Sequence, residues 1–140
     1  MAKKKNTVIL STRDELTRIC MDEVMYVESD GNYVRLCFRS GRSVEVLASM
    51  RNIEHLVLNL DNVSFLRVGR RHIINLSYLS QVNTMRCTIT LADDSTKETS
   101  TLSVSKESIS ILKNSLSRQS RTPIPDFHTS NGKMEAYLDD

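Results

Sequence analysis

The segment YVRLCFR, residues 33–39, alternates apolar and polar side chains, and this period of two is typical of a half-buried antiparallel strand. One face of the strand is apolar and would pack on a core: Val34, Leu36 and Phe38. The other face is polar and basic: Tyr33, Arg35 and Arg39. The turn sequences SDGN at 29–32 and SGR at 40–42 would join this strand to strands at Met25–Glu28 and Ser43–Val46.

Strand-like segments continue on both sides of this unit. They are Thr7–Leu10, Glu15–Cys20, Phe65–Val68, Leu79–Asn83, Met85–Leu91 and Thr96–Val104. Because strands of this kind account for most of the chain, the predicted fold class is mostly β, with antiparallel β-sheets or a sandwich and one or two short helices.

Two segments have helical spacing instead. Ser49 is a suitable N-cap, and it precedes an apolar stripe of Met50, Ile53, Leu56 and Val57. Ser105, with Glu107 in the first turn, precedes a second stripe of Ile109, Leu112 and Leu116. Both segments predict short helices whose apolar stripes cover a sheet rather than form a groove for a partner.

The composition indicates an ordinary soluble domain. The chain has 140 residues, of which 39% are hydrophobic, and this is enough for one sizeable core plus a tail. The sequence contains no apolar run of about 18 residues and no signal peptide, so we expect no membrane association. Cys20, Cys37 and Cys87 are widely spaced without a C-x-x-C pair, which favours reduced thiols and a cytoplasmic location.

Charge is distributed unevenly along the chain. The first 121 residues are basic in balance, whereas residues 122–140 hold Lys133 against four carboxylates. No carboxylate occurs between Asp61 and Asp93, where Arg67, Arg70, Arg71 and Arg86 all fall. Such a stretch could attract phosphate, and a solvated face of an ordinary domain is the alternative interpretation.

Catalytic chemistry has no support in the sequence. It contains no nucleophile elbow, no phosphate-binding glycine-rich loop and no histidines at metal-ligand spacing. We therefore expect no enzyme activity, no catalytic residue, no metal site, no cofactor and no small-molecule substrate. The expected organisation is a basic segment at 1–5, one domain at 6–118, and an acidic flexible tail at 119–140.

Three ordered blocks resemble the LytTR family. The string EVMYVESDGNY at 23–33 resembles a family strand ending in Glu and followed by a short loop ending Asn-Tyr. The string FLRVGRRHIINL at 65–76 resembles the signature Phe-x-Arg-Ile-His-Arg-Ser-x-Ile-Val-Asn, and LSVSK at 102–106 resembles the strand-to-helix junction Val-Ser-Arg. The family often has His where this chain has Gly69, and Ser where it has Arg71.

The resemblance implies a bacterial transcription regulator that binds double-stranded DNA through loops. Family members usually serve as output domains of response regulators in two-component signalling, and they recognise paired promoter repeats, which implies a homodimer on DNA. The expected DNA-binding residues lie at the start of the 33–39 strand, in the loop before Ile73, and at the 105–106 junction. They are Asn32, Tyr33, Arg35, Arg70, Arg71, His72, Ser105 and Lys106.

The expected roles differ between these residues. Arg70 is the first candidate for base readout, because its guanidinium can grip guanine O6 and N7, and Arg71 would bind a phosphate or a second base. A merely solvated turn is the alternative for both. Asn32 and Tyr33 would either fix their loop or stack on the DNA backbone. Asn75 is predicted to bond nearby backbone.

Regulation is less defined by the sequence. Few residues precede the first predicted strand, so we expect a stand-alone regulator without a receiver domain, and the excised output half of a longer regulator is the alternative. The tail would contact a partner, compete weakly for the basic face, or have no role. A β module for protein interaction or signalling that keeps the fold without binding DNA is the rival function.

Overall fold

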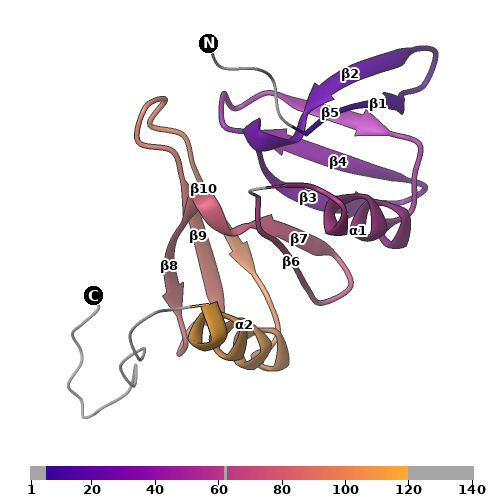
Figure 1. Cartoon of the computed structure of the whole chain (residues 1–140). Helices are drawn as coiled ribbons and strands as arrows, with labels where there is room; N and C mark the ends of the chain where they lie inside the picture. Colours follow the sequence, from indigo (N-terminus) through magenta and orange to yellow (C-terminus); the bar gives the residue numbers. More distant parts are fainter. Residues whose placement is uncertain (1–5, 62, 120–140) are drawn as a thin grey trace.

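The computed structural model describes residues 6–61 and 63–119. Within these residues the chain forms ten strands in three antiparallel sheets, together with two α-helices (Figure 1). The predicted fold class is therefore confirmed.

A five-stranded sheet lies at the centre of the molecule, with strand order β5-β4-β3-β7-β6. Its strands are β3 (Val24–Asp30), β4 (Tyr33–Phe38), β5 (Ser43–Val46), β6 (Phe65–Val68) and β7 (His72–Asn75). The turns on both sides of β4 each contain a glycine in the left-handed region, Gly31 with φ +65° and Gly41 with φ +91°. These turns make β3, β4 and β5 the meander that the alternating pattern predicts.

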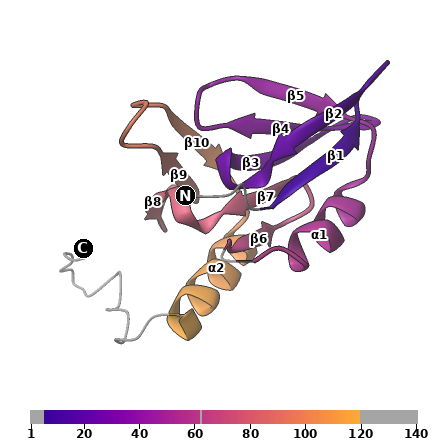
Figure 2. The same cartoon turned by 45° about the horizontal axis from the view of Figure 1, so that its top comes forward.

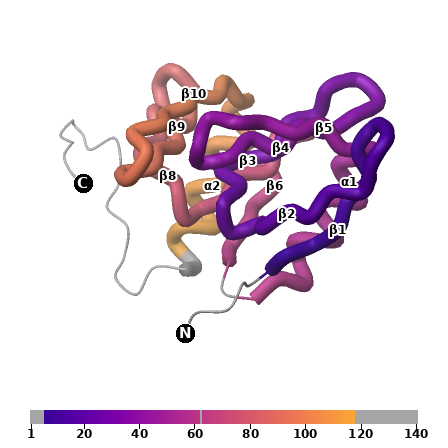
Figure 3. The backbone as a smooth tube through the Cα atoms, turned by 90° about the horizontal axis from the view of Figure 1, so that it is seen from above, coloured from indigo at the N-terminus to yellow at the C-terminus, as the bar shows by residue number. Residues whose placement is uncertain are grey.

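Smaller sheets and helices cover both faces of the central sheet (Figures 2 and 3). One small sheet pairs β1 (Thr7–Ser11) with β2 (Leu16–Cys20), and the short 3₁₀ helix η1 (Met21–Glu23) follows it. The other has the order β10-β9-β8. Its strands and the remaining helices are β8 (Leu79–Asn83), β9 (Thr88–Ala92), β10 (Thr99–Ser103), α1 (Met50–Leu58), η2 (Leu76–Tyr78) and α2 (Lys106–Gln119).

Two apolar clusters lie on opposite faces of the central sheet. The first contains Val27 and Ile73 from the sheet and Ile53 from α1. The second contains Ile74 from the sheet and Leu112 from α2, together with buried residues of β9 and β10. Because neighbouring residues of a strand point to opposite faces, the central sheet belongs to both cores and positions α1 and α2 relative to each other.

The structure adds one strand that was not predicted and corrects the first residue of two others. β7 was not predicted as a strand, because all four of its residues are buried and it has no apolar-polar alternation. β9 begins at Thr88 rather than Met85, since Cys87 has a φ of +56° and belongs to the preceding turn. β10 begins at Thr99 rather than Thr96, since Lys97 has a φ of +66°.

The β9–β10 turn is tied to the end of β4. Arg39 Nε lies 3.3 Å from Asp93 Oδ1, and Thr96 Oγ1 donates to the Arg39 carbonyl at 2.6 Å. The backbone N–H of Thr96 also donates to Asp93, and together with Arg39 it lowers the pKa of that carboxyl. These contacts fix the three-stranded sheet against the central one.

Candidate DNA-binding face

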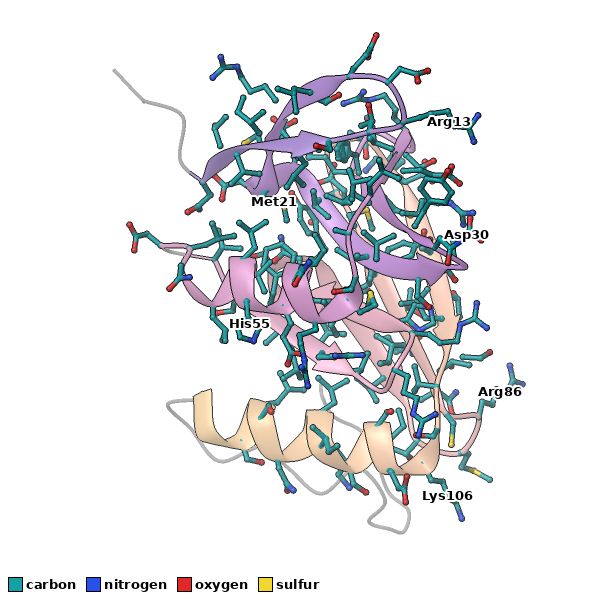
Figure 4. The ribbon with its side chains drawn as sticks, turned by 90° about the vertical axis from the view of Figure 1, so that its right-hand side faces the viewer. Arg13, Met21, Asp30, His55, Arg86 and Lys106 are labelled. Atoms are coloured by element: carbon teal, nitrogen blue, oxygen red, sulfur yellow. The ribbon has the colours of Figure 1, made fainter. Side chains whose placement is uncertain are left out.

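Six of the eight predicted contact residues come from three loops that lie on one side of the molecule. The loops are the β3–β4 turn (30–33), the β6–β7 turn (69–71) and the β10–α2 junction (104–106), and we call them the three-loop face. Ser29 N donates to the Arg71 carbonyl at 2.9 Å, which joins the first loop to the second. Figure 4 shows Asp30 and Lys106 on the same side.

The β6–β7 turn presents two arginines from a backbone that is tied by hydrogen bonds. Arg67 Nε donates to the Gly69 carbonyl at 3.0 Å, and its Nη2 donates to the Arg70 carbonyl at 3.2 Å. The Arg71 carbonyl accepts from Ser29, so all three carbonyls of the turn are bonded. The side chains of Arg70 and Arg71 are exposed, and within the described residues neither forms an ion pair.

Arg67 is a functional candidate that sequence reasoning missed. Its Nη1 pairs with Glu54 Oε1 of α1 at 3.0 Å, so one guanidinium links the helix to the turn. In the sequence Arg67 was only one member of a basic stretch. The only sequence signal for a role in the turn was its place two residues before Gly69. Its partner Glu54 on α1 is 13 residues away in the chain, so the sequence did not indicate that pair.

The first turn of α2, next to the third loop, approaches the second loop at Gly69. This glycine has a φ of +84°, and a methyl group at this position would lie 3.0 Å from Ser108 Oγ of α2. Gly31 also has positive φ, but a methyl group there would have nothing within 4 Å. Substitutions at these two glycines share the cost of backbone strain, and only the substitution at Gly69 adds a steric contact.

We expect Gly69→Ala to destabilise the protein more than Gly31→Ala. Both variants place an L side chain in the left-handed region, at a cost of about 1 kcal/mol. Only Gly69→Ala also requires the Ser108 hydroxyl to move. Urea denaturation of both variants measures the difference in unfolding free energy. Equal losses would show that the β6–β7 turn does not press on α2.

The β10–α2 junction contributes one capping residue and one exposed cation. Ser105 Oγ accepts from Ser108 N at 3.0 Å and donates to Ser108 Oγ at 2.9 Å, which confirms the predicted N-cap. Lys106 is the exposed first residue of α2. Since the N-terminal end of a helix carries partial positive charge, Lys106 and the helix end reinforce each other toward an anion.

Two of the predicted contact residues, Arg35 and His72, contact carboxylates of the protein itself. Arg35 Nη1 lies 3.1 Å from Glu28 Oε1, and its Nη2 pairs with Asp30 and, at 3.8 Å, with Glu45. Partial desolvation acts to lower the pKa of Arg35, but Asp30 and Glu28 outweigh it and raise that pKa. Arg35 therefore offers little net charge to a phosphate.

His72 shares the same carboxylate. Its side chain is only 10% exposed, its Nε2 lies 3.3 Å from Glu28 Oε2, and its ring centroid is 6.4 Å from that of Tyr26. Glu28 of β3 thus contacts both Arg35 of β4 and His72 of β7, and neither of these two residues lies in the three loops.

The remaining predicted residues divide between surface and core. Asn32 is exposed in its turn, and Tyr33 is half-buried at the start of β4. Asn75 is 1% exposed; its Nδ2 donates to the Val24 carbonyl at 2.9 Å, and its Oδ1 accepts from Ser77 N at 3.0 Å. The prediction that Asn75 bonds backbone is confirmed.

Within residues 6–61 and 63–119 no group of three His, Cys, Asp or Glu side chains could hold a metal ion. Neither helix there is long and apolar enough to cross a bilayer. The predicted segment 1–5 lies outside the described residues, as does the predicted tail 119–140 apart from Gln119 at the end of α2. The predicted domain boundaries stay predictions.

Comparison with known proteins agrees with the fold. A solved LytTr DNA-binding domain from Bacillus cereus matches with a TM-score of 0.59 and 23% identity, covering 81% of this chain and 98% of that chain. No curated protein matches this chain. The family model described as LytTr DNA-binding domain matches residues 14–117. Since that match spans most of the sequence, the chain belongs to the LytTR family of DNA-binding domains.

Proposed function

We propose that this chain is a sequence-specific regulator of transcription that binds double-stranded DNA through the three-loop face. This proposal rests mainly on the β6–β7 turn. Its three carbonyls are all hydrogen-bonded, while the side chains of Arg70 and Arg71 are exposed to solvent. A rigid backbone lowers the entropy that is lost when an arginine docks on a base. Arg70 is the proposed base reader and Arg71 a phosphate contact.

The other predicted residues have supporting roles in this proposal. Lys106 and the N-terminal end of α2 bind a neighbouring phosphate, and Ser105 caps that helix. Asn32 and Tyr33 contact the DNA backbone from the β3–β4 turn. Arg35 and His72 act as positioning residues through Glu28.

We expect two copies of the chain to bind one duplex. The family resemblance implies paired promoter repeats, and a homodimer places the same face on each half-site. Duplexes selected by the protein would then contain two copies of one short motif, and the complex would contain two chains per duplex.

Selection of binding sites from random duplexes tests this function. We expect an enriched motif for the unmodified chain, and Arg70→Ala is expected to lose about 1–3 kcal/mol of preference at one base pair within it. Arg71→Ala should weaken binding to all duplexes to a similar extent and reduce the salt dependence.

Arg18→Ala is the matched control, because Arg18 is an exposed arginine of β2 in the two-stranded sheet. This variant should select the same motif as the unmodified chain. Failure of the unmodified chain to bind any duplex at low salt would overturn the proposed function and leave the protein-interaction module as the better interpretation.

A further inference from the structure

The β8–β9 turn, residues 84–87, is closed by hydrogen bonds between its own groups. Asn83 Oδ1 accepts from the Arg86 backbone N–H at 2.9 Å, and Cys87 Sγ donates to the Thr84 carbonyl at 3.8 Å. Cys87 closes the turn in the left-handed region, with a φ of +56°. The turn is therefore a defined platform for the two residues at its tip, Met85 and Arg86.

This turn adjoins the three-loop face. Val104 N donates to the Cys87 carbonyl at 2.9 Å, so the turn is bonded directly to the residue that precedes Ser105 and Lys106. Figure 4 shows Arg86, Lys106 and Asp30 on the same side of the molecule. A duplex seated on the β10–α2 junction would meet the β8–β9 turn next.

The tip of the turn combines an apolar and a cationic side chain. Met85 is 92% exposed, the highest value among the large hydrophobic residues of the described chain. Arg86 is exposed, and within the described residues it forms no ion pair, in contrast to Arg35, Arg39 and Arg67, which each pair with a carboxylate. The 31 positions from 62 to 92 contain no acidic residue.

This pair of side chains matches the alternating chemistry of a nucleic-acid backbone. A guanidinium binds a phosphate through charge-assisted hydrogen bonds, and an unbranched thioether adapts to the apolar surface of a deoxyribose. We propose that the β8–β9 turn is a fourth DNA-binding loop, in which Arg86 binds a phosphate and Met85 packs on the adjacent sugar. This inference rests on the proposed function and extends the interface beyond the three-loop face on the α2 side.

The salt dependence of binding tests this proposal on the full chain. Each phosphate contact contributes a slope of about −0.9 in log affinity against log salt concentration. Arg86→Ala should therefore flatten the slope by about 0.9 and weaken binding about fivefold at roughly 0.15 M salt, equally for selected and random duplexes. Met85→Ala should weaken binding about threefold, because apolar contact is lost, with the slope unchanged.

Lys97→Ala is the control, since Lys97 lies in the β9–β10 turn at the opposite end of the three-stranded sheet. It should bind with the affinity and slope of the unmodified chain. Urea denaturation shows whether the turn variants fold normally; we expect unchanged stability, because the bonds that hold the turn do not involve the side chains of Met85 or Arg86.

The possible outcomes separate this inference from the function on which it rests. A folded Arg86→Ala variant with unchanged slope and affinity overturns the fourth loop, and the proposed function stands if Arg70→Ala still loses its base preference. Absence of binding by the unmodified chain overturns both. An equal loss for Arg86→Ala and Lys97→Ala would show a general charge effect and would also overturn the assignment.

Discussion

Leu112→Ala is expected to lower the free energy of unfolding by about 3–5 kcal/mol. Leu112 is completely buried and lies in the second core, where α2 packs against the central and three-stranded sheets. The shortened side chain would leave a cavity lined by residues of several strands, which cannot all move to fill it. Urea or thermal denaturation monitored by circular dichroism measures this loss.

Ile111→Ala is the matched control on the same helix. Ile111 is 49% exposed, so about half of its side-chain surface is already in water. We expect a loss below about 1 kcal/mol, partly offset because alanine favours the helix more than isoleucine does. Comparable losses for the two variants would mean that α2 does not pack through the face that contains Leu112.

Local patterns were sufficient to predict most of the fold. β4 alternates between core and polar face, and its apolar residues Val34, Leu36 and Phe38 are all buried as expected. Ser49 accepts from Asn52 N at the start of α1, as its position before the apolar stripe predicted. Both features depend on residues within a few positions of each other.

The errors come from segments whose structure depends on distant residues. Ile73 and Ile74 of β7 belong to opposite cores, so the strand has no polar face and no alternation. Cys87 and Lys97 adopt positive φ without being glycines, and a sequence pattern does not signal such positions. The predicted strands therefore extended into the turns that precede β9 and β10.

The candidate site was only partly predictable for the same reason. The three loops were identified by family resemblance, whereas the hydrogen bond between Ser29 and Arg71 and the close approach of Gly69 to Ser108 exist only in the folded chain. Arg35 is an instructive case. The two predicted turns set the strand register, and that register places Arg35 opposite Glu28 on β3 and Glu45 on β5. Cross-strand ion pairing was therefore implicit in the sequence.

Arg67→Lys is expected to weaken DNA binding about tenfold although it keeps the positive charge. Arg67 uses separate nitrogens to reach the Gly69 carbonyl, the Arg70 carbonyl and Glu54. A single ammonium group cannot reproduce this planar arrangement. Without it the β6–β7 turn would have to be ordered when DNA binds, and fixing even one residue costs about 1–2 kcal/mol. Titration of the selected duplex at fixed salt measures the effect.

Two comparisons distinguish a positioning role for Arg67 from a simple electrostatic one. Arg67→Ala should bind DNA with about the affinity of Arg67→Lys, because both variants lose the bonds to the turn. If the charge of residue 67 itself contacts DNA, Arg67→Ala should also change the salt slope, whereas Arg67→Lys should not. Glu54→Gln keeps an oxygen acceptor for Arg67 and leaves the turn carbonyls bonded, so it should bind DNA nearly normally. If Arg67→Lys binds as tightly as the unmodified chain, the turn holds its shape without Arg67, and the positioning role is wrong. A loss confined to Arg67→Ala would show instead that Arg67 contributes only its charge.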